Sequence, residues 1–288
     1  MANTLEISYI GSACGKNKYE PRNKTIFLML CRKNPKKYLE LLKITGVITD
    51  LEDNIGLEKP VQDSYKKFKS QVNDPKEFSK IETEVINDIK VKNPNITEPE
   101  IQTAREMISS SLKKDCGKNV EETVISRENY TKGNNRMWYY RIKNWTLKGL
   151  HDASSGDMVV EIKTRMSLQN VRKNEYDLYQ LFGYILVMGK TKGVITQTFR
   201  NVIYKSDIET EREFGIVNIE TDYWKAKFDK FQEELHKFFK DVDNHYENND
   251  FDISTVFKEE FCPYAQVDQN GKFHNIKPEF TNVFKALS

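Results

Sequence analysis

Cysteine is scarce in this chain, and long apolar runs are missing. The 288 residues include four widely separated cysteines: Cys14, Cys31, Cys116 and Cys262. Because no two of them form a C-x-x-C pair, a zinc ribbon is not supported, and a reducing, intracellular compartment is the simplest expectation. No apolar stretch is long enough to cross a bilayer, and the first residues lack the basic-then-apolar pattern of a signal peptide. We therefore expect a soluble protein with no membrane partner.

The sequence also lacks a complete phosphate-binding loop, a hydrolase triad and the common DNA-binding motifs. Gly11 to Asn17 superficially suggests a phosphate-binding loop. However, three residues separate its glycines where four are needed, and Asn17 stands where Ser or Thr would bind magnesium. His151, Asp152 and Ser154 are too close along an extended strand to adopt the geometry of a hydrolase triad. No helix-turn-helix or zinc-finger DNA reader is visible.

The composition is that of a well-solvated protein with a real core. Hydrophobic residues make up 38% of the chain, and charged residues 31%. The length suits one large domain, or a core with an inserted subdomain. We expect residues 1–34 and 112–250 to form the core, 35–111 to form a helical subdomain, and 251–288 to form a C-terminal extension. The pattern also predicts a helix at 36–45, a strand near 123–130 and a long helix at about 222–246. The apolar stripe of this last helix, more typical of a core than of an interface, consists of Trp224, Phe228, Phe231, Leu235 and Phe238.

The net charge of +2 is too small to indicate a nucleic-acid binder, but the charge is unevenly distributed. Residues 123–151 include six basic residues but only one acid, Glu128, and five aromatic residues are interleaved with them. The basic residues are Arg127, Lys132, Arg136, Arg141, Lys143 and Lys148. This composition is typical of a surface that neutralises phosphates and stacks on bases. A pair of aromatic-rich strands with a solvated basic face explains it equally well.

The segment from Gly149 to Lys163 sets one acid ahead of an acid-x-lysine. Alternate residues of a strand face the same way, so Glu161 and Lys163 share one face. Residues 154–157, Ser-Ser-Gly-Asp, are typical of a turn, and the resulting hairpin would bring Asp152 beside Glu161. Two carboxylates and an ammonium at a strand end suit Mg²⁺ and phosphodiester hydrolysis. The alternative is a surface hairpin with an ordinary Glu–Lys pair.

Helices on both sides of this hairpin carry further polar residues. Glu121 follows Gly117 on a predicted helix, where an acid near the N-terminus is also favoured by the helix dipole. After the hairpin, Gln180 and Tyr184 form a polar stripe beside an apolar face at helical spacing. Glu122 and Asp157 remain rivals of Glu121 and Asp152.

In this order, the three segments resemble the PD-(D/E)xK nuclease superfamily, in its RecB-like arrangement. The segment Ile10 to Tyr19 is similar to the one that opens YqaJ-type viral recombinases, which favours the lambda-exonuclease branch. The resemblance covers residues 5–30 and 112–205, and His151 stands where the usual proline precedes the aspartate. It implies an α/β (α+β) fold: a restriction-endonuclease-like core with a central mixed β-sheet flanked by helices, plus a helical insertion.

The resemblance also assigns roles to residues. It implies Glu121, Asp152, Glu161 and the backbone carbonyl of Ile162 as ligands of one or two Mg²⁺ (or Mn²⁺) ions. It implies Asp152, Glu161 and Lys163 as catalytic residues, with Gln180 and Tyr184 orienting the lysine or the DNA. Contacts to nucleic acid are expected from Ser12, at a terminal phosphate, and from Arg136, Arg141, Lys143 and Arg165.

The activity implied is a DNA exonuclease that degrades duplex ends, 5′ to 3′, in recombination or repair. A homo-oligomer and a single-strand annealing protein are the partners that such enzymes suggest, and a viral or phage source would place the protein in the cytoplasm or nucleus of its host. Some relatives hold an iron-sulfur cluster with three cysteines near the C-terminus, but only Cys262 lies there, so we expect no cluster. An endonuclease or nickase on the same scaffold, or a non-catalytic nucleic-acid-binding protein, are the alternatives.

Overall fold

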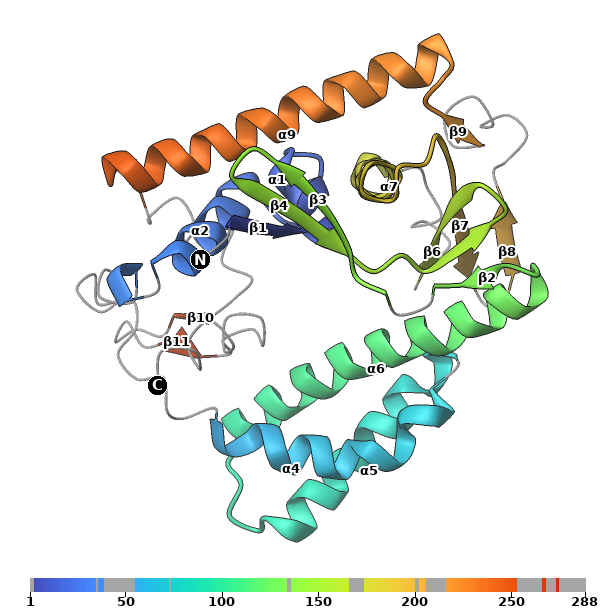
Figure 1. Ribbon diagram of the computed structural model, residues 1–288. Coiled ribbons are helices and arrows are strands. Elements are labelled where there is room, and N and C mark those ends of the chain that lie inside the picture. The colour runs from blue at the N-terminus through green and yellow to red at the C-terminus, as the bar shows by residue number, and fades with distance from the viewer. Residues whose placement is uncertain are drawn as a thin grey trace.

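The computed structural model describes residues 3–34, 36–38, 55–72, 74–133, 136–165, 174–199, 202–205, 216–252, 266–267 and 273–274. It has a mixed α/β architecture in which α-helices surround two mixed β-sheets (Figure 1), consistent with the α+β class that we predicted. Most of the predicted helix 36–45, nearly all of the extension 251–288, and Cys262 lie outside the described residues. Within the described ranges, no helix combines the length and apolar character that crossing a membrane requires.

The N-terminal half of the chain is mostly helical. Its elements are β1 (Asn3–Glu6), η1 (Ile7–Tyr9), α1 (Ile10–Ala13), α2 (Arg22–Lys33), α4 (Ile55–Tyr65), η3 (Lys66–Gln71), η4 (Pro75–Glu77), α5 (Phe78–Lys92) and α6 (Glu98–Arg127).

The second half supplies most of the strands. Its elements are β2 (Thr131–Lys132), β3 (Trp138–Ile142), β4 (Trp145–Gly149), β5 (Ala153–Ser155), β6 (Met158–Thr164), α7 (Glu175–Met188), β7 (Lys192–Phe199), β8 (Val202–Lys205), β9 (Val217–Asn218), α9 (Asp222–Asn248), β10 (Gln266–Val267) and β11 (Phe273–His274).

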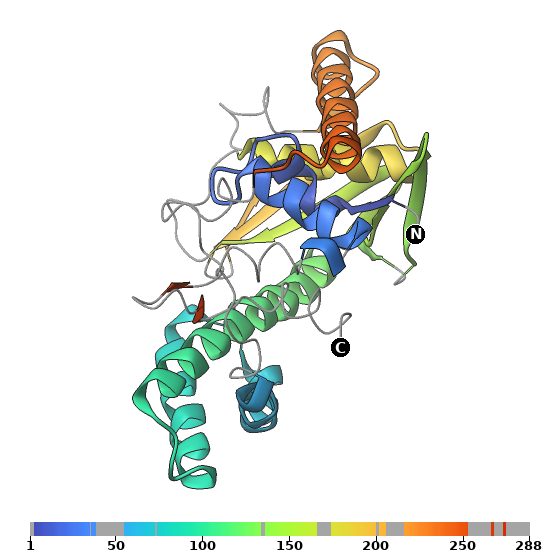
Figure 2. The same cartoon turned by 90° about the vertical axis from the view of Figure 1, so that its left-hand side faces the viewer.

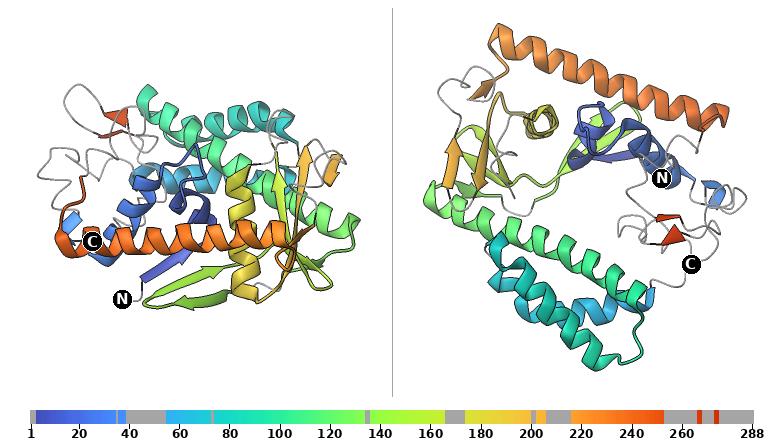
Figure 3. Two further views of the ribbon diagram at one scale, coloured as in Figure 1. Left: turned by 90° about the horizontal axis from the view of Figure 1, so that it is seen from above. Right: turned by 180° about the vertical axis from the view of Figure 1, so that it is seen from behind.

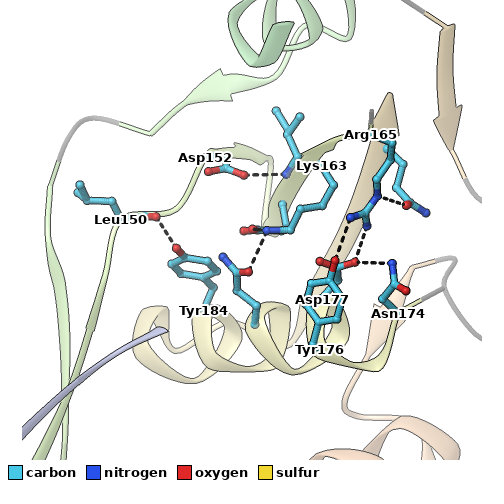
Figure 4. A network of polar contacts seen from close by, with 12 residues as sticks. Leu150, Asp152, Lys163, Arg165, Asn174, Tyr176, Asp177 and Tyr184 are labelled. Carbon is cyan, nitrogen blue, oxygen red and sulfur yellow. Dashed lines mark hydrogen bonds and ion pairs between the residues drawn. The ribbon is translucent and has the colours of Figure 1, made fainter. Parts of the chain in front are cut away.

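Two mixed sheets contain most of the strands, and β10 and β11 form a separate antiparallel pair. The smaller sheet has the order β1-β4-β3, with β1 parallel and β3 antiparallel to β4. The larger sheet has the order β2-β5-β6-β7-β8, and β9 also pairs with β7. Because β6 and β7 are parallel, the chain must cross over between them, and α7 lies within this crossover. The crossover places α7 beside the face of β6 that carries Glu161 and Lys163 (Figure 4).

One antiparallel ribbon connects the two sheets. Lys132 pairs with Ala153 in the larger sheet, and Trp138 pairs with Gly149 in the smaller one. Five residues separate these pairs on one side and three on the other. Asp152 lies on the shorter side, and its carbonyl accepts from the Gly133 amide at 2.9 Å.

The main core lies between the sheets and α9. Figure 3 shows α9 crossing over α7, α1 and α2, and the apolar stripe predicted for α9 faces this core. The buried residues of that stripe are Trp224, Phe228, Phe231, Leu235 and Phe238. Phe182 of α7 meets Phe228 and Phe231 with ring centroids 5.4 and 5.6 Å apart. This aromatic packing anchors α7, which carries Gln180 and Tyr184.

A second core lies on the other side of the larger sheet. Helices α4, α5 and α6 form a layer that projects away from α9 (Figure 2), and their apolar residues pack with Ala153, Val160 and Ile162. α6 begins at a capping box made by Thr97 and Glu100 and continues for 30 residues. The expected boundary between residues 111 and 112 therefore falls inside this helix.

The strand that we predicted at residues 123–130 is wrong, because most of that segment is the last part of α6. Thr123, Val124 and Ile125 favour a strand by local propensity. In the folded chain, Val120 and Val124 are buried one helical turn apart in the second core, and this packing outweighs the local preference.

Helix α1 packs so closely on α7 that it needs a glycine. A Cβ added at Gly11 would lie 2.6 Å from the Cβ of Tyr176 and 3.0 Å from its Cα, and backbone cannot move aside as a flexible side chain can. We expect Gly11→Ala to lower the free energy of unfolding by about 1–3 kcal/mol. Gly117→Ala is the control, because its Cβ meets nothing within 4 Å and alanine favours a helix interior by about 1 kcal/mol. Urea denaturation that shows equal stability for the two variants would contradict this close packing.

Candidate active site

The β5–β6 hairpin brings Asp152 and Glu161 together, as its turn signal predicted. The turn lies at Gly156 and Asp157, and Gly156 adopts a φ of 60°, which glycine tolerates without strain. Asp152 reaches the neighbouring strand, where its Oδ2 accepts from the amide of Ile162 at 2.7 Å. Val160 and Ile162 pack against the helical layer. Lys163 instead points toward α7 (Figure 4), and Glu161 lies on the same side of β6, with its Oε1 2.6 Å from the lysine Nζ. The alternation predicted for this strand is therefore confirmed.

Lys163 is held between a carboxylate and an amide. Its Nζ lies 2.6 Å from Glu161 Oε1 and donates to Gln180 Oε1 at 2.8 Å. One turn further along α7, the Tyr184 hydroxyl donates to the carbonyl of Leu150 at 2.6 Å, two residues before Asp152. The polar stripe of α7 thus binds both segments that carry the site, and it fixes them relative to each other.

The carboxylates of the site repel one another in a poorly solvated place. Burial, with added repulsion from Asp152, raises the pKa of Glu161 to about 8 against the pull of Lys163. Burial and the charge of Glu121 raise the pKa of Asp152 to about 6. Burial and Glu161 likewise raise the pKa of Glu121, which reaches the group from α6. Clustered acids with raised pKa values are a physical sign of a functional site.

Lys163 is the positive centre of this group. Burial alone would lower the pKa of its ammonium, but the carboxylates of Glu161 and Asp177 outweigh that effect and raise it. The lysine therefore stays charged at neutral pH beside Glu161, which is 1% exposed. Burial and the nearby Glu161 and Asp152 charges also raise the pKa of the Tyr184 hydroxyl, so it remains a donor.

The donors present fit a magnesium ion better than a metal of the zinc type. Across the part of the chain that the structure describes, no three His, Cys, Asp or Glu side chains form a ready ligand shell. Magnesium does not need one, since it keeps several waters and binds through one or two carboxylates. Glu161 Oε2 is buried and has no hydrogen-bond partner, which leaves one oxygen available to a cation. A cation here would also relieve the repulsion that raises the three carboxyl pKa values.

The alternative acids lie outside this group. The Glu122 carboxylate pairs with Lys132 at 2.6 Å and is 65% exposed, so it occupies the solvent side of α6. Asp157 pairs with Lys192 at 3.2 Å and is 67% exposed. Glu121 and Asp152 are therefore the better members of each rival pair.

The residues predicted to contact nucleic acid are dispersed. Arg141 and Lys143 lie toward the far end of the β3–β4 hairpin, about 10 Å along the strand from the Trp138–Gly149 pair. Arg136 is exposed and lies over the ring of Trp138, 5.0 Å from its centroid. Ser12 is fully buried in α1, where its Oγ donates to Glu20 and accepts from Asn17, both at 3.2 Å. The hydroxyl of Ser12, which we expected to contact a terminal phosphate, therefore forms its hydrogen bonds with two side chains of the same chain.

Arg165 differs most from its predicted placement. Its side chain is only 8% exposed, and its nitrogens donate to Gln197, Tyr176 and Asp177. These partners cannot be predicted from the sequence, because a single charged residue after a strand does not show whether its side chain turns inward. Asp177, in the first turn of α7, is equally typical of an acid that stabilises a helix N-terminus.

Comparison with known proteins adds little to this geometry. No protein-family model matches the sequence, and no curated protein matches it. Among solved structures, the chain is similar to one titled "Crystal structure of SSO0001", with 16% sequence identity and a TM-score of 0.33. The similarity covers 59% of this chain and 78% of that one. A likeness at this level carries no conclusion about fold or function, so function must be inferred from the residues themselves.

Proposed function

We propose that this protein is a metal-dependent DNA nuclease with a restriction-endonuclease-like core. The observation that carries the proposal is the arrangement of Asp152, directly before β5, beside Glu161 and Lys163 on β6, with Gln180 bound to the lysine at 2.8 Å. Glu121, Asp152, Glu161 and the carbonyl of Ile162 would hold Mg²⁺ or Mn²⁺. Such an ion neutralises a scissile phosphate and lowers the pKa of bound water.

The protein's own groups have distinct parts in this chemistry. The ammonium of Lys163 lies beside Glu161, where it would orient the attacking water or stabilise charge that develops on the phosphate. Gln180 accepts from that ammonium and so fixes its direction. Tyr184 holds the Leu150 carbonyl and therefore the segment that leads to Asp152. These side chains pre-organise the site, which spares their reorganisation during reaction.

An end-directed exonuclease acting 5′ to 3′ on duplex DNA is the activity that we favour within this class. The test is cleavage of end-labelled linear DNA and covalently closed circular DNA with Mg²⁺, Mn²⁺ or EDTA. Metal-dependent loss of the linear form alone would support the exonuclease, and the label would report polarity. Cutting of the circle would replace it with the endonuclease or nickase. If no divalent ion supports cleavage of DNA or RNA, while nucleic acid still binds, the nuclease proposal fails.

The outer face of the β1-β4-β3 sheet is our candidate for the DNA-contacting surface. Tyr139 is 63% exposed and shares this face with Arg141, while Lys148 pairs with Tyr139 across the ladder. Glu6, the acid on this face, is neutralised by Arg32 and by Lys148 at 3.1 Å. The face therefore offers unbalanced positive charge and an exposed ring, as phosphate contact and base stacking require.

We expect the Tyr139→Ala, Arg141→Ala double variant to weaken DNA binding by about tenfold, since one stacked base is worth about 1–3 kcal/mol. Losing a phosphate contact should also reduce the salt dependence of binding. Fluorescence anisotropy in EDTA at several salt concentrations measures both effects. Tyr223→Ala, Lys227→Ala is a matched control, because the exposed Tyr223 forms a cation–π pair with Lys227 on α9, 4.8 Å from nitrogen to ring centroid. Equal binding by the two double variants would exclude this face.

A further inference from the structure

A buried ion pair joins the end of β6 to the first turn of α7. The Nη2 of Arg165 donates to Asp177 Oδ2, and these two side chains are 8% and 1% exposed. The Nε of Arg165 donates to Gln197 on β7 at 2.8 Å, and its Nη1 donates to the Tyr176 hydroxyl at 3.2 Å. The backbone amide of Arg165 also donates to the carbonyl of Thr198 at 2.7 Å. Arg165 is thus fixed by β7 and by α7 at once (Figure 4).

Stability alone is a poor reason for such a pair. Removing two charges from water costs about as much as their attraction returns, and an apolar pair of similar volume commonly does as well. What a planar guanidinium adds is direction, because its donors point along fixed axes toward several partners. The network around Arg165 therefore specifies a geometry between β6 and α7.

The position of the pair shows which geometry is specified. Arg165 lies two residues after Lys163 and directly follows β6, and Asp177 lies three residues before Gln180 on α7. Asp177, Gln180 and Tyr184 have the i, i+3, i+7 spacing of one helical stripe. Each residue of the stripe bonds to the chain across from it: Asp177 to Arg165, Gln180 to Lys163, and Tyr184 to Leu150. The ion pair is the first of three contacts, counted from the N-terminus of α7, that align this helix with the site.

We propose that Arg165 and Asp177 are positioning residues whose ion pair sets where α7 meets β6 and thereby holds Gln180 against Lys163. This inference rests on the proposed nuclease function for its kinetic consequences. Arg165, expected from the sequence to contact phosphate, acts in this view through other residues.

The first test compares Arg165→Lys and Asp177→Asn with wild type under single-turnover and steady-state conditions. We expect kcat to fall at least tenfold in both variants while KM for linear DNA stays unchanged, because substrate contacts are intact. Arg22→Lys is the matched control. Its guanidinium bonds to Asp241 at 2.6 Å and to the Ala13 carbonyl at 3.0 Å, away from the site. A loss of activity that only follows the loss of Tm, alike in Arg22→Lys and Arg165→Lys, would overturn the proposal.

A double-mutant cycle with Gln180→Ala tests whether the ion pair acts by positioning Gln180 or only by stabilising the fold. If the pair acts by holding Gln180 on Lys163, then Arg165→Lys should change kcat by less than about twofold once Gln180 is absent. If the decreases in kcat caused by Arg165→Lys and by Gln180→Ala are fully additive in free energy, the pair does not act through Gln180.

Hydrogen exchange at residues 175–181 supplies a readout that needs no activity. We expect Arg165→Lys to accelerate exchange there, and Arg22→Lys to leave it unchanged. If wild type proves inactive, the nuclease proposal falls by itself, and this exchange experiment still decides whether the pair anchors α7.

Discussion

Lys163→Ala is expected to reduce metal-dependent cleavage by about two to three orders of magnitude, the usual cost of removing one pre-organised charge-stabilising group. The ammonium lies 2.6 Å from Glu161 and donates to Gln180. Lys163 is also the one basic residue of β6, so no other cation of this strand can replace it. Folding should survive, because Glu161 has a pKa of about 8 and can remain protonated when its partner is removed. Single-turnover cleavage of end-labelled DNA with Mg²⁺ measures the effect.

The control for this variant is Lys192→Ala on the neighbouring strand. Lys192 pairs with the exposed Asp157 at 3.2 Å, outside the site, and its loss should leave the rate within about twofold of wild type, as expected of an exposed pair. DNA binding, measured in EDTA, should be similar for both variants. If purified Lys163→Ala keeps wild-type activity, the assignment of the whole acid-x-lysine segment as a catalytic site is wrong.

Asp152→Asn should lose cleavage and yet gain stability at neutral and higher pH. The folded protein raises the pKa of Asp152 from 3.8 to about 6, so its charged form is disfavoured there. Between those two values the folded chain binds more protons than the unfolded chain, so the free energy of unfolding falls as pH rises through this window. Above pH 6 the full cost remains, on the order of 1–3 kcal/mol. Asparagine removes the charge but keeps an oxygen for the Ile162 amide.

The measurement is thermal unfolding in EDTA at pH 4 and pH 8. Asp152→Asn should raise Tm by a few degrees at pH 8, since 1 kcal/mol corresponds to about 2–4 °C in a chain of this size or slightly smaller. At pH 4 the difference should nearly disappear. Asp157→Asn serves as the control, because its exposed carboxylate lies outside the acidic cluster. A Tm for Asp152→Asn that is lower than wild type at pH 8 would mean that this carboxylate stabilises the fold.

Local periodicity predicted the parts of the site that depend on one element. Strand alternation placed Glu161 and Lys163 on a common face, and helical spacing placed Gln180 and Tyr184 together on α7. Contacts between distant segments were harder to foresee. The inward turn of Arg165 depends on Asp177 and Gln197, which lie 12 and 32 residues away.

Segment 123–130 was misassigned because a distant contact outweighs its local preference. Its residues favour a strand, but in the folded chain α6 packs on the apolar surface beneath β5 and β6. Burial of Val120 and Val124 against that surface decides the conformation, and this term is invisible in a short window of sequence.

Helix α6 has a consequence for how the protein folds. Its apolar residues belong to the same buried cluster as α4 and α5, and that cluster also contains Val160 and Ile162, the strand residues next to Glu161. We therefore expect the helical layer and the β5–β6 hairpin to unfold as a single cooperative unit, although the sequence suggests a helical subdomain. A fragment that begins near residue 112 would expose the underside of β6 and should behave as an aggregating intermediate. Limited proteolysis of the native protein should accordingly release no stable fragment of this kind.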